Sequence, residues 1–273
     1  MAAVMELLPA VAEQKISVRG VTKEYVLPRG EVLCALQNVD VQVRRGEFLC
    51  IVGPSGSGKS TLLHIIAGLV SPTRGEVVID GGRPKGPGPD RILIFQDLGL
   101  FPWLTVLENV EFGLKMQGVP ARERRDLARY YLSLVHLSRV EQGFLHQLSG
   151  GMKQRLSLAR ALVLGPSVLL MDEPFAALDA QTRDLLHDEL ERLWEETGQT
   201  IVFVTHNVRE AVRLGDRVLV MSHHPGRIKQ EFAISLGRSR HLEDPEVALQ
   251  AREILAELRG EIDKAVRAEY RGE

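Results

Sequence analysis

Phe48-Leu49-Cys50-Ile51-Val52 runs without a break into Gly53-Pro54-Ser55-Gly56-Ser57-Gly58-Lys59-Ser60-Thr61. The apolar first part predicts a strand that is buried on both faces. The glycines let successive backbone N–H groups close around phosphate oxygens. Leucines and isoleucines then recur at helical spacing over 59–69, so a helix N-terminus points at the same place. Strand, loop and helix together predict a loop that binds the phosphates of a nucleotide.

Within this loop the charged and hydroxyl side chains have separate roles. Lys59 supplies a positive charge for the β- and γ-phosphates, and Ser60 supplies a hydroxyl ligand for Mg²⁺. A chance glycine-rich turn is the alternative, but it would not explain the strand before the loop and the helix after it. The predicted phosphate contacts are Gly53, Pro54, Ser55, Gly56, Ser57, Gly58, Lys59, Ser60 and Thr61.

A second apolar run, Val168-Leu169-Leu170-Met171, ends in the pair Asp172-Glu173. A buried strand of this kind places both carboxylates at the carboxyl edge of a sheet, where phosphates bind. Capping of the next helix is the alternative for such a pair.

A third motif is Leu148-Ser149-Gly150-Gly151-Met152-Lys153-Gln154-Arg155. Gly150 and Gly151 leave backbone amides uncovered at a helix start, and Ser149 adds a hydroxyl, so the turn is suited to an anion. A capped helix start is the simpler interpretation, but it does not explain the paired glycines.

These three motifs, in this order, resemble the ATP-binding cassette (ABC) family from about Ile16 to Ile234. The resemblance implies an α/β fold: a P-loop NTPase core with an antiparallel β subdomain and an inserted helical subdomain. It implies ATP and Mg²⁺ as cofactors, with Asp172 on the metal and Glu173 polarising the attacking water. It also implies that Ser149, Gly150 and Gly151 bind the γ-phosphate of ATP held by a second chain.

Four more residues carry family roles by the same resemblance. Gln96 resembles the glutamine that senses Mg²⁺ and water and touches the membrane partner, and His206 the histidine that contacts the γ-phosphate. Asp179 resembles the residue that links the two sites of the dimer. Tyr25 resembles the aromatic residue that stacks on adenine. For His206 and Tyr25, an ordinary surface or core position is the alternative.

The chain divides into a flexible lead-in at 1–14, an ATPase domain at 15–237 and a C-terminal helical extension at 238–273. The helical subdomain is expected at about 97–165, with Arg122–Arg125 on a solvated face. Its expected apolar stripe is Leu127, Tyr130, Tyr131, Leu134 and Val135. Apolar residues at three- and four-residue steps after Pro245 predict an amphipathic helix. This helix packs against its own domain or serves a regulatory or dimer contact.

Bulk properties exclude several classes. The 273 residues, 44% of them hydrophobic, can bury a large core. A net charge of -2 gives no case for nucleic acid as a partner. No apolar run approaches the roughly 20 residues that span a bilayer, and Met1–Glu13 lacks the pattern of a secretory signal. A cytosolic chain that reaches the membrane through a partner is therefore expected.

Two local features each allow two interpretations. The pair His223-His224 is metal-binding or, without further ligands nearby, an ordinary loop. Trp103 follows Gln96 closely, so it either lines a groove for a helix of the membrane subunit or packs inside the helical subdomain.

Some segments are most similar to the nitrate, sulfonate and taurine importers: Phe95-Gln96-Asp97, Leu100-Phe101-Pro102-Trp103, Glu173 to Arg183 and Pro225-Gly226-Arg227-Ile228. Two departures, His223-His224 and Ala176, leave the substrate branch open. The resemblance implies an ATP-hydrolysing importer subunit at the cytoplasmic face of the cell membrane. Its expected partners are a second copy of the chain, transmembrane permease subunits and, indirectly, a periplasmic or extracellular solute-binding protein.

Three alternatives belong to other classes. One is a nucleotide-gated module without hydrolysis, and another is a soluble cassette protein that acts on a nucleic-acid or protein complex. The third is an ATPase of lipid or metal transport.

Overall fold

In the computed structural model, which describes residues 13–28, 30–176 and 178–271, the chain forms two sheets and three groups of helices. Most of the expected lead-in, residues 1–12, lies outside the described residues. Its last residue, Gln14, already begins strand β1 (Gln14–Val26).

The larger sheet has six strands in the order β5-β6-β7-β3-β8-β9. The strands are β5 (Arg91–Ile94), β6 (Val168–Asp172), β7 (Thr200–Thr205), β3 (Phe48–Val52), β8 (Arg217–Met221) and β9 (Ile228–Ala233). All neighbours are parallel except β9, which runs antiparallel to β8. Every residue of β3, β6 and β7 is buried, as expected for parallel strands covered on both faces.

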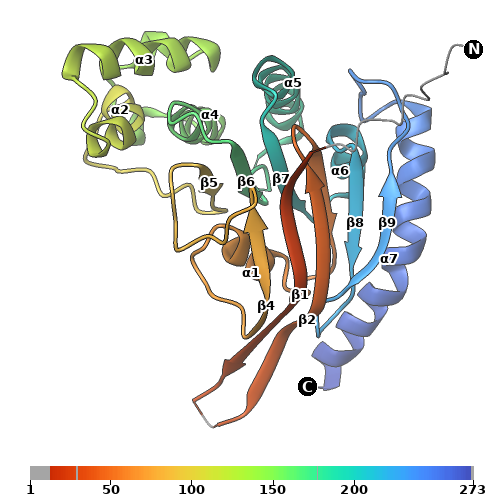
Figure 1. The fold of residues 1–273 in the computed structure, drawn as a ribbon. Helices are drawn as coiled ribbons and strands as arrows, with labels where there is room; N and C mark the ends of the chain where they lie inside the picture. The colour runs from red at the N-terminus through yellow and green to blue at the C-terminus, as the bar shows by residue number, and fades with distance from the viewer. Residues whose placement is uncertain (1–12, 29, 177, 272–273) are drawn as a thin grey trace, which may run out of the picture.

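A smaller antiparallel sheet covers one face of the large one (Figure 1). It consists of β1, β2 (Val32–Arg44) and β4 (Arg74–Ile79), and helix α1 (Lys59–Ile66) lies between the sheets. β1 runs from Gln14 to Val26, well past the alternating apolar positions Ile16 and Val18. Bulges in its pairing with β2 break the two-residue alternation after Val18, which hides the rest of the strand from pattern analysis.

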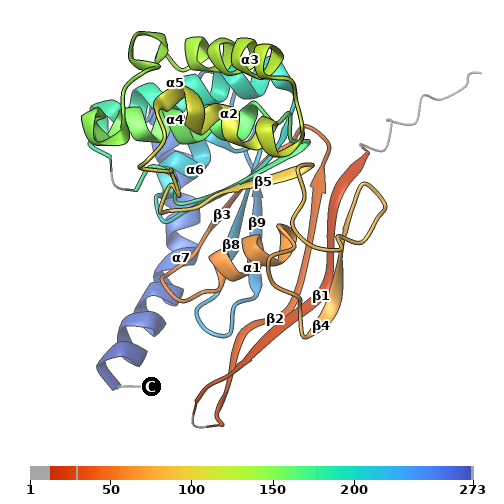
Figure 2. The same cartoon turned by 90° about the vertical axis from the view of Figure 1, so that its left-hand side faces the viewer.

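Helices α5 (Ala180–Thr197), α6 (Val208–Leu214) and α7 (Pro245–Arg271) cover the opposite face. In α7 four apolar side chains are buried in the same core, namely Val247, Ala251, Ile254 and Leu258. The C-terminal helix thus packs along the edge of its own domain, as Figures 1 and 2 show. None of the helices in the described residues is long and apolar enough to cross a membrane.

The third group is the helical subdomain between β5 and β6, seen at the top of Figure 2. It contains α2 (Val106–Met116), α3 (Ala121–Leu134) and α4 (Gly150–Leu162), with short 3₁₀ turns at Ser138–Val140 and Leu145–Gln147. Its core is its own, but α4 also buries Leu158, Ala161 and Leu162 in the core of the large sheet. The position of α4 therefore joins the subdomain to the catalytic core.

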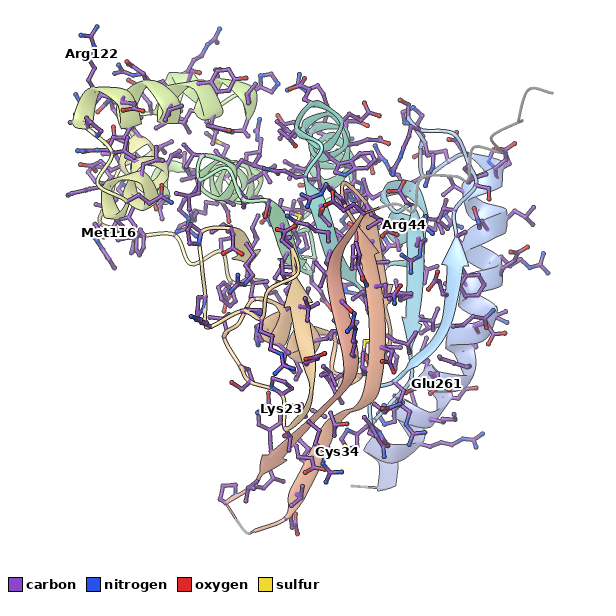
Figure 3. The ribbon with its side chains drawn as sticks, viewed as in Figure 1. Lys23, Cys34, Arg44, Met116, Arg122 and Glu261 are labelled. Atoms are coloured by element: carbon purple, nitrogen blue, oxygen red, sulfur yellow. The ribbon has the colours of Figure 1, made fainter. Side chains whose placement is uncertain are left out.

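Two expectations for α3 were wrong in detail. The buried line is Ala128, Leu132 and Val135, whereas Leu127 and Tyr130 are exposed. The small Ala128 faces the core, which rotates the stripe away from the larger residues. Arg122 points to solvent (Figure 3).

The expected solvated face is wrong only at Arg124, whose side chain is partly buried, whereas Arg125 is exposed like Arg122. Arg124 and Arg125 lie 3.1 and 3.4 Å from the buried carboxylate of Glu111. This carboxylate on α2 is a partner that the local sequence of α3 does not reveal.

Candidate functional site

The predicted site residues gather at one edge of the large sheet. β5, β6, β7 and β3 are neighbouring parallel strands, so their carboxyl ends meet. Four segments leave that edge: the glycine-rich loop after β3, Gln96 after β5, Asp172-Glu173 at the end of β6 and His206 after β7. Residues from four separate parts of the sequence are thus brought together. The side chain of Gln96 is exposed there.

The glycine-rich loop is a tight cradle. Gly56 and Gly58 have φ angles of 75° and 84°, and a Cβ on Gly58 would lie 2.6 Å from Leu36 Cδ2, so the second position requires glycine. The Lys59 ammonium is buried and donates hydrogen bonds to the carbonyls of Gly53 and Pro54, both at 2.9 Å. Burial lowers the pKa of Lys59, and the charges of Glu173 and Asp172 oppose that shift.

One polar atom in the cradle is left over. The Ser57 Oγ is fully buried and has no hydrogen-bond partner among the described residues. A buried hydroxyl without a partner is unfavourable, and this one lies where the backbone curves around the loop. The cradle therefore fits an additional polar group such as a phosphate oxygen.

Asp172 and Ser60 form an oxygen-rich corner beside the cradle. Burial raises the pKa of the Asp172 carboxyl, and hydrogen bonding from the Ser60 hydroxyl opposes the shift. A carboxylate and a hydroxyl are hard oxygen donors of the kind that Mg²⁺ prefers. A cation between them would also offset the unfavourable buried charge of Asp172.

Glu173 and His206 face each other across neighbouring strands. Glu173 Oε2 lies 3.1 Å from His206 Nδ1. Glu173 has a positive φ of 46°, which is uncommon for a residue with a side chain, and its N–H donates to the carbonyl of Val204 at 2.9 Å. That bond to β7 holds the turn that aims the carboxylate toward His206.

The Ser149–Gly151 turn lies elsewhere. Ser149 Oγ accepts the N–H of Met152 at 3.3 Å and caps α4. The N-terminal end of α4 lines a groove of about 370 Å³. The described walls of this groove come from α4, α5 and the segment just after α3. A Cβ on Gly151 would lie 2.4 Å from Thr182 Cγ2, so close packing on α5 requires this glycine.

Asp179 caps α5 from the same side. Its carboxylate accepts the Thr182 N–H at 2.9 Å and the Thr182 hydroxyl at 2.8 Å. These hydrogen bonds, the backbone one first, lower the pKa of Asp179. Thr182 therefore contacts both Gly151 and Asp179, and it joins two predicted residues of the dimer interface within one chain.

Three further candidates lie outside these motifs: Tyr25, Trp103 and the pair His223-His224. Tyr25 lies on β1 in the small sheet, half-buried under the Lys23 ammonium at 4.9 Å from the ring centre. Trp103 is 71% exposed, so packing inside the helical subdomain is excluded. The described residues contain no group of three metal-ligating side chains. The His223 N–H donates to Glu261 Oε2 at 2.9 Å, as in an ordinary loop; Glu261 is labelled in Figure 3.

The Pro-Gly-Arg-Ile turn supports the cradle, a role that was not predicted from the sequence. The Gly226 N–H donates to the Ala35 carbonyl at 3.1 Å. A Cβ on Gly226 would come within 2.1 Å of the Ser57 carbonyl. The Pro-Gly-Arg-Ile turn, which served only as a mark of resemblance, thus braces the glycine-rich loop. A glycine directly after proline was the available signal.

Comparisons with known proteins agree with this geometry. Residues 36–176 match the family model described as ABC transporter. The nitrate import ATP-binding protein NrtD of Synechocystis sp. is 49% identical over 221 residues, which cover 81% of this chain and 83% of that protein. The taurine import ATP-binding protein TauB of Roseobacter denitrificans is 43% identical over 219 residues, which cover 80% of this chain and 82% of that protein.

A solved structure extends the likeness to the fold. A dimeric ATP-binding cassette in a post-hydrolysis state, bound to ADP and Pi, has a TM-score of 0.73 and 37% sequence identity. The match covers 81% of this chain and all of that one. This chain belongs to the ABC transporter family, and its fold is that of an ABC-type ATPase. ATP binding and ATP hydrolysis are its activity.

Proposed function

We propose that this chain is the ATP-hydrolysing subunit of an importer and that two copies bind two ATP molecules between them. One observation carries the proposal: two helix starts suited to a phosphate, those of α1 and α4, lie at different places on one molecule. The cradle at the strand edge holds Lys59, Asp172, Glu173 and His206 together. The Ser149–Gly151 turn lines a separate groove and needs the nucleotide of another copy.

The residues at the edge divide the hydrolysis among them. The cradle from Gly53 to Thr61 binds the phosphates, with Lys59 moving from its two backbone carbonyls to the β- and γ-phosphate oxygens. Ser60, Asp172 and Gln96 would hold Mg²⁺, which neutralises charge on the phosphates when bound.

Glu173 accepts a hydrogen bond from the attacking water and orients it, a role typically worth about 10²–10⁴ in rate. His206 lies 3.1 Å from that carboxylate and donates toward the γ-phosphate. In the paired molecule Ser149, Gly150 and Gly151 close the site from the other side, with Asp179 linking the two sites and Tyr25 stacking on adenine.

The permease is expected to dock beside Trp103. A groove of about 480 Å³ runs along α2 and α3, and its walls include the exposed Trp103, Phe112 and the guanidinium groups of Arg125 and Arg129. An exposed tryptophan at the rim of a groove with both apolar and charged walls is typical of an interface anchor. This contact would hold the ATPase at the cytoplasmic face of the cell membrane.

The transported solute is proposed from relatives alone. The relatives described above are named for nitrate and taurine import, so a small anion such as nitrate, taurine or an aliphatic sulfonate is the proposed cargo. A periplasmic or extracellular solute-binding protein would deliver it to the permease.

A trapped complex tests the proposal. Glu173→Gln keeps the size of the side chain but weakens the base, so this variant is expected to bind ATP, remain paired and hydrolyse at least about 100-fold more slowly. A tagged variant, with Mg·ATP, is used as bait in solubilised membranes of the host and the partners are identified by mass spectrometry. A stoichiometric multi-spanning protein is expected.

Lys59→Ala in the same bait is the control, because it removes the phosphate contact and should lose the ATP-dependent pairing. Recovery of soluble partners alone would overturn the importer assignment, and rapid hydrolysis by Glu173→Gln would overturn the role of Glu173.

A further inference from the structure

A buried polar network lies behind the Glu173–His206 pair. Its centre is His187 on α5, whose side chain has no exposed surface. The His187 Nε2 lies 2.7 Å from Glu210 Oε1 on α6. On the other side of the ring, His187 Nδ1 lies 3.2 Å from Arg213 Nη1. A fully buried imidazole with both nitrogens engaged has a fixed orientation.

The partners also fix where the ring proton lies. A guanidinium group only donates hydrogen bonds, so Nδ1 must accept from Arg213. The Asp184 carboxylate is 3.8 Å from Nδ1, which is too far for a hydrogen bond. The proton is therefore on Nε2, and this N–H donates to the Glu210 carboxylate.

Glu210 connects His187 to Thr205, the residue directly before His206. Its side chain is buried, and its second oxygen accepts a hydrogen bond from the hydroxyl of Thr205, the last residue of β7. Thr205 Oγ1 in turn accepts the N–H of Asn207 at 3.0 Å. His206 thus lies between two residues that one hydroxyl ties together, so its backbone is fixed on both sides.

A second contact reaches the strand that carries Glu173. The ring of Phe175 packs edge-on against His187, with centroids 5.3 Å apart. Phe175 belongs to the turn after Glu173, which is closed by a hydrogen bond from the Ala176 N–H to the Glu173 carbonyl at 3.2 Å. A cavity of only about 20 Å³, lined by Glu173, His206, Thr205 and Glu210 among others, separates the network from the pair.

We propose that His187 is a positioning residue for ATP hydrolysis. Through Glu210 and Thr205 it fixes His206, and through Phe175 it supports the turn that carries Glu173. The inference rests on the proposed roles of Glu173 and His206 and adds a residue that no motif includes. His187 does not touch ATP, because its side chain has no exposed surface. It acts on geometry, and small displacements at a reacting centre lower the rate about 10²-fold.

Matched pairs of variants separate positioning from general stability. Thr205→Val removes the hydroxyl at equal size, whereas Thr205→Ser keeps it. His187→Leu removes both hydrogen bonds, whereas His187→Gln offers one donor and one acceptor in their place. For the Val and Leu variants kcat is expected to fall roughly 10- to 100-fold, with the KM for ATP changed by less than about twofold. The Ser and Gln variants should recover most of the rate.

Glu47→Gln is the control for a general loss of stability when a buried hydrogen-bonded side chain is changed. Glu47 pairs with Arg217 Nη1 at 2.6 Å, just before the start of β3 and away from the carboxyl edge of the sheet. This variant should lower the Tm and leave kcat near that of the unchanged chain. If Thr205→Val and His187→Leu lower only the Tm, as this control does, the positioning role is wrong.

A double-variant cycle tests the route through His206. In a His206→Ala background the route through His206 is already lost, so His187→Leu should lower kcat by clearly less than it does in the unchanged chain, with only the contact through Phe175 left, because coupled residues are not additive. Multiplying effects would overturn the route. A His206→Ala variant that hydrolyses ATP at the full rate would instead contradict the proposed function of His206, which distinguishes the two failures.

Discussion

Two helix starts of this chain are suited to phosphate, and they differ in how complete they are. At the start of α1, a buried Lys59 and the residues at the ends of β6 and β7 surround the cradle. At the start of α4, Ser149 and Gly150 are exposed. Within the chain, the Ser149 side chain caps the helix. The first turn, with the side chains around it, forms a complete phosphate site within one chain, which we call the finished site. The second turn offers only amides, a hydroxyl and a helix dipole, and we call it the unfinished turn.

The difference follows from what holds each helix. α1 leaves the central strand β3, so four parallel strands of the same sheet deliver side chains to its N-terminus. α4 belongs to the inserted subdomain and reaches the large sheet with its C-terminal part, where Leu158, Ala161 and Leu162 are buried. Its N-terminus lines a separate groove with α5. This placement supports the proposal that the turn acts on the nucleotide of another molecule.

The largest expected effect is at the finished site. Lys59→Ala removes the only buried ammonium of the described cradle residues, and we expect ATP hydrolysis to fall by roughly 10²–10³, as for the loss of one preorganised charge at a reacting centre. Steady-state phosphate release measures it. Lys85→Ala, which removes an exposed ammonium from the loop between β4 and β5, is the control and should keep the hydrolysis rate within about threefold. Equal activity of Lys59→Ala and the unchanged chain would contradict the cradle.

The second prediction separates the two helix starts. Gly150→Asp places a negative charge where the γ-phosphate of a partner's ATP would lie. A Cβ at Gly150 has its nearest neighbour, Leu178 Cδ2, at 3.8 Å, and an acidic residue favours the first turn of a helix. The fold should therefore be kept.

In a Glu173→Gln background, Gly150→Asp is expected to leave the Kd of the single chain for ATP unchanged and to abolish ATP-dependent pairing. Sedimentation with ATP measures the pairing. A pair that still forms would mean that the α4 turn does not face the nucleotide.

The finished site could be predicted from the sequence because its residues stand at strand ends. The buried runs Phe48–Val52 and Val168–Met171 predict parallel strands, and parallel strands bring Lys59, Asp172 and Glu173 to one edge. Local pattern and the family motif agree in these places.

What could not be predicted depends on contacts between distant segments. The network of His187, Glu210 and Thr205 joins α5, α6 and β7, and no local pattern connects them. The partial burial of Arg124 likewise depends on Glu111, which lies on another helix. Strand β9 also escaped prediction, because only Ile228 and Phe232 are half-buried in a run that is otherwise exposed.

A third prediction concerns the electrostatic cost of the finished site. Burial raises the pKa of Asp172 above its ordinary value of 3.8, so its contribution to stability is present below the unfolded-state pKa and is lost as the pH rises through the folded-state pKa. At pH 7 the buried charge therefore destabilises the ligand-free chain.

Asp172→Asn should raise the Tm of that chain by roughly a few degrees at most at pH 7, and the gain should shrink as the pH falls toward 4. Calorimetry across this range measures it. A gain that grows on acidification would reverse the sign of the argument.

The smallest effect is expected at the unfinished turn. Ser149→Ala removes the oxygen that accepts the Met152 N–H at 3.3 Å and should lower the free energy of unfolding by about 1 kcal/mol, the usual value of an N-cap. Ser149→Asn, which keeps a capping oxygen, should restore stability. The two roles of the turn then separate, because the cap requires only an acceptor, whereas a γ-phosphate requires a donor. If Ser149→Asn recovers both stability and ATP-dependent pairing, its side-chain amide has replaced the hydroxyl as that donor. If neither variant changes the pairing, the backbone amides of Gly150 and Gly151 alone bind the phosphate.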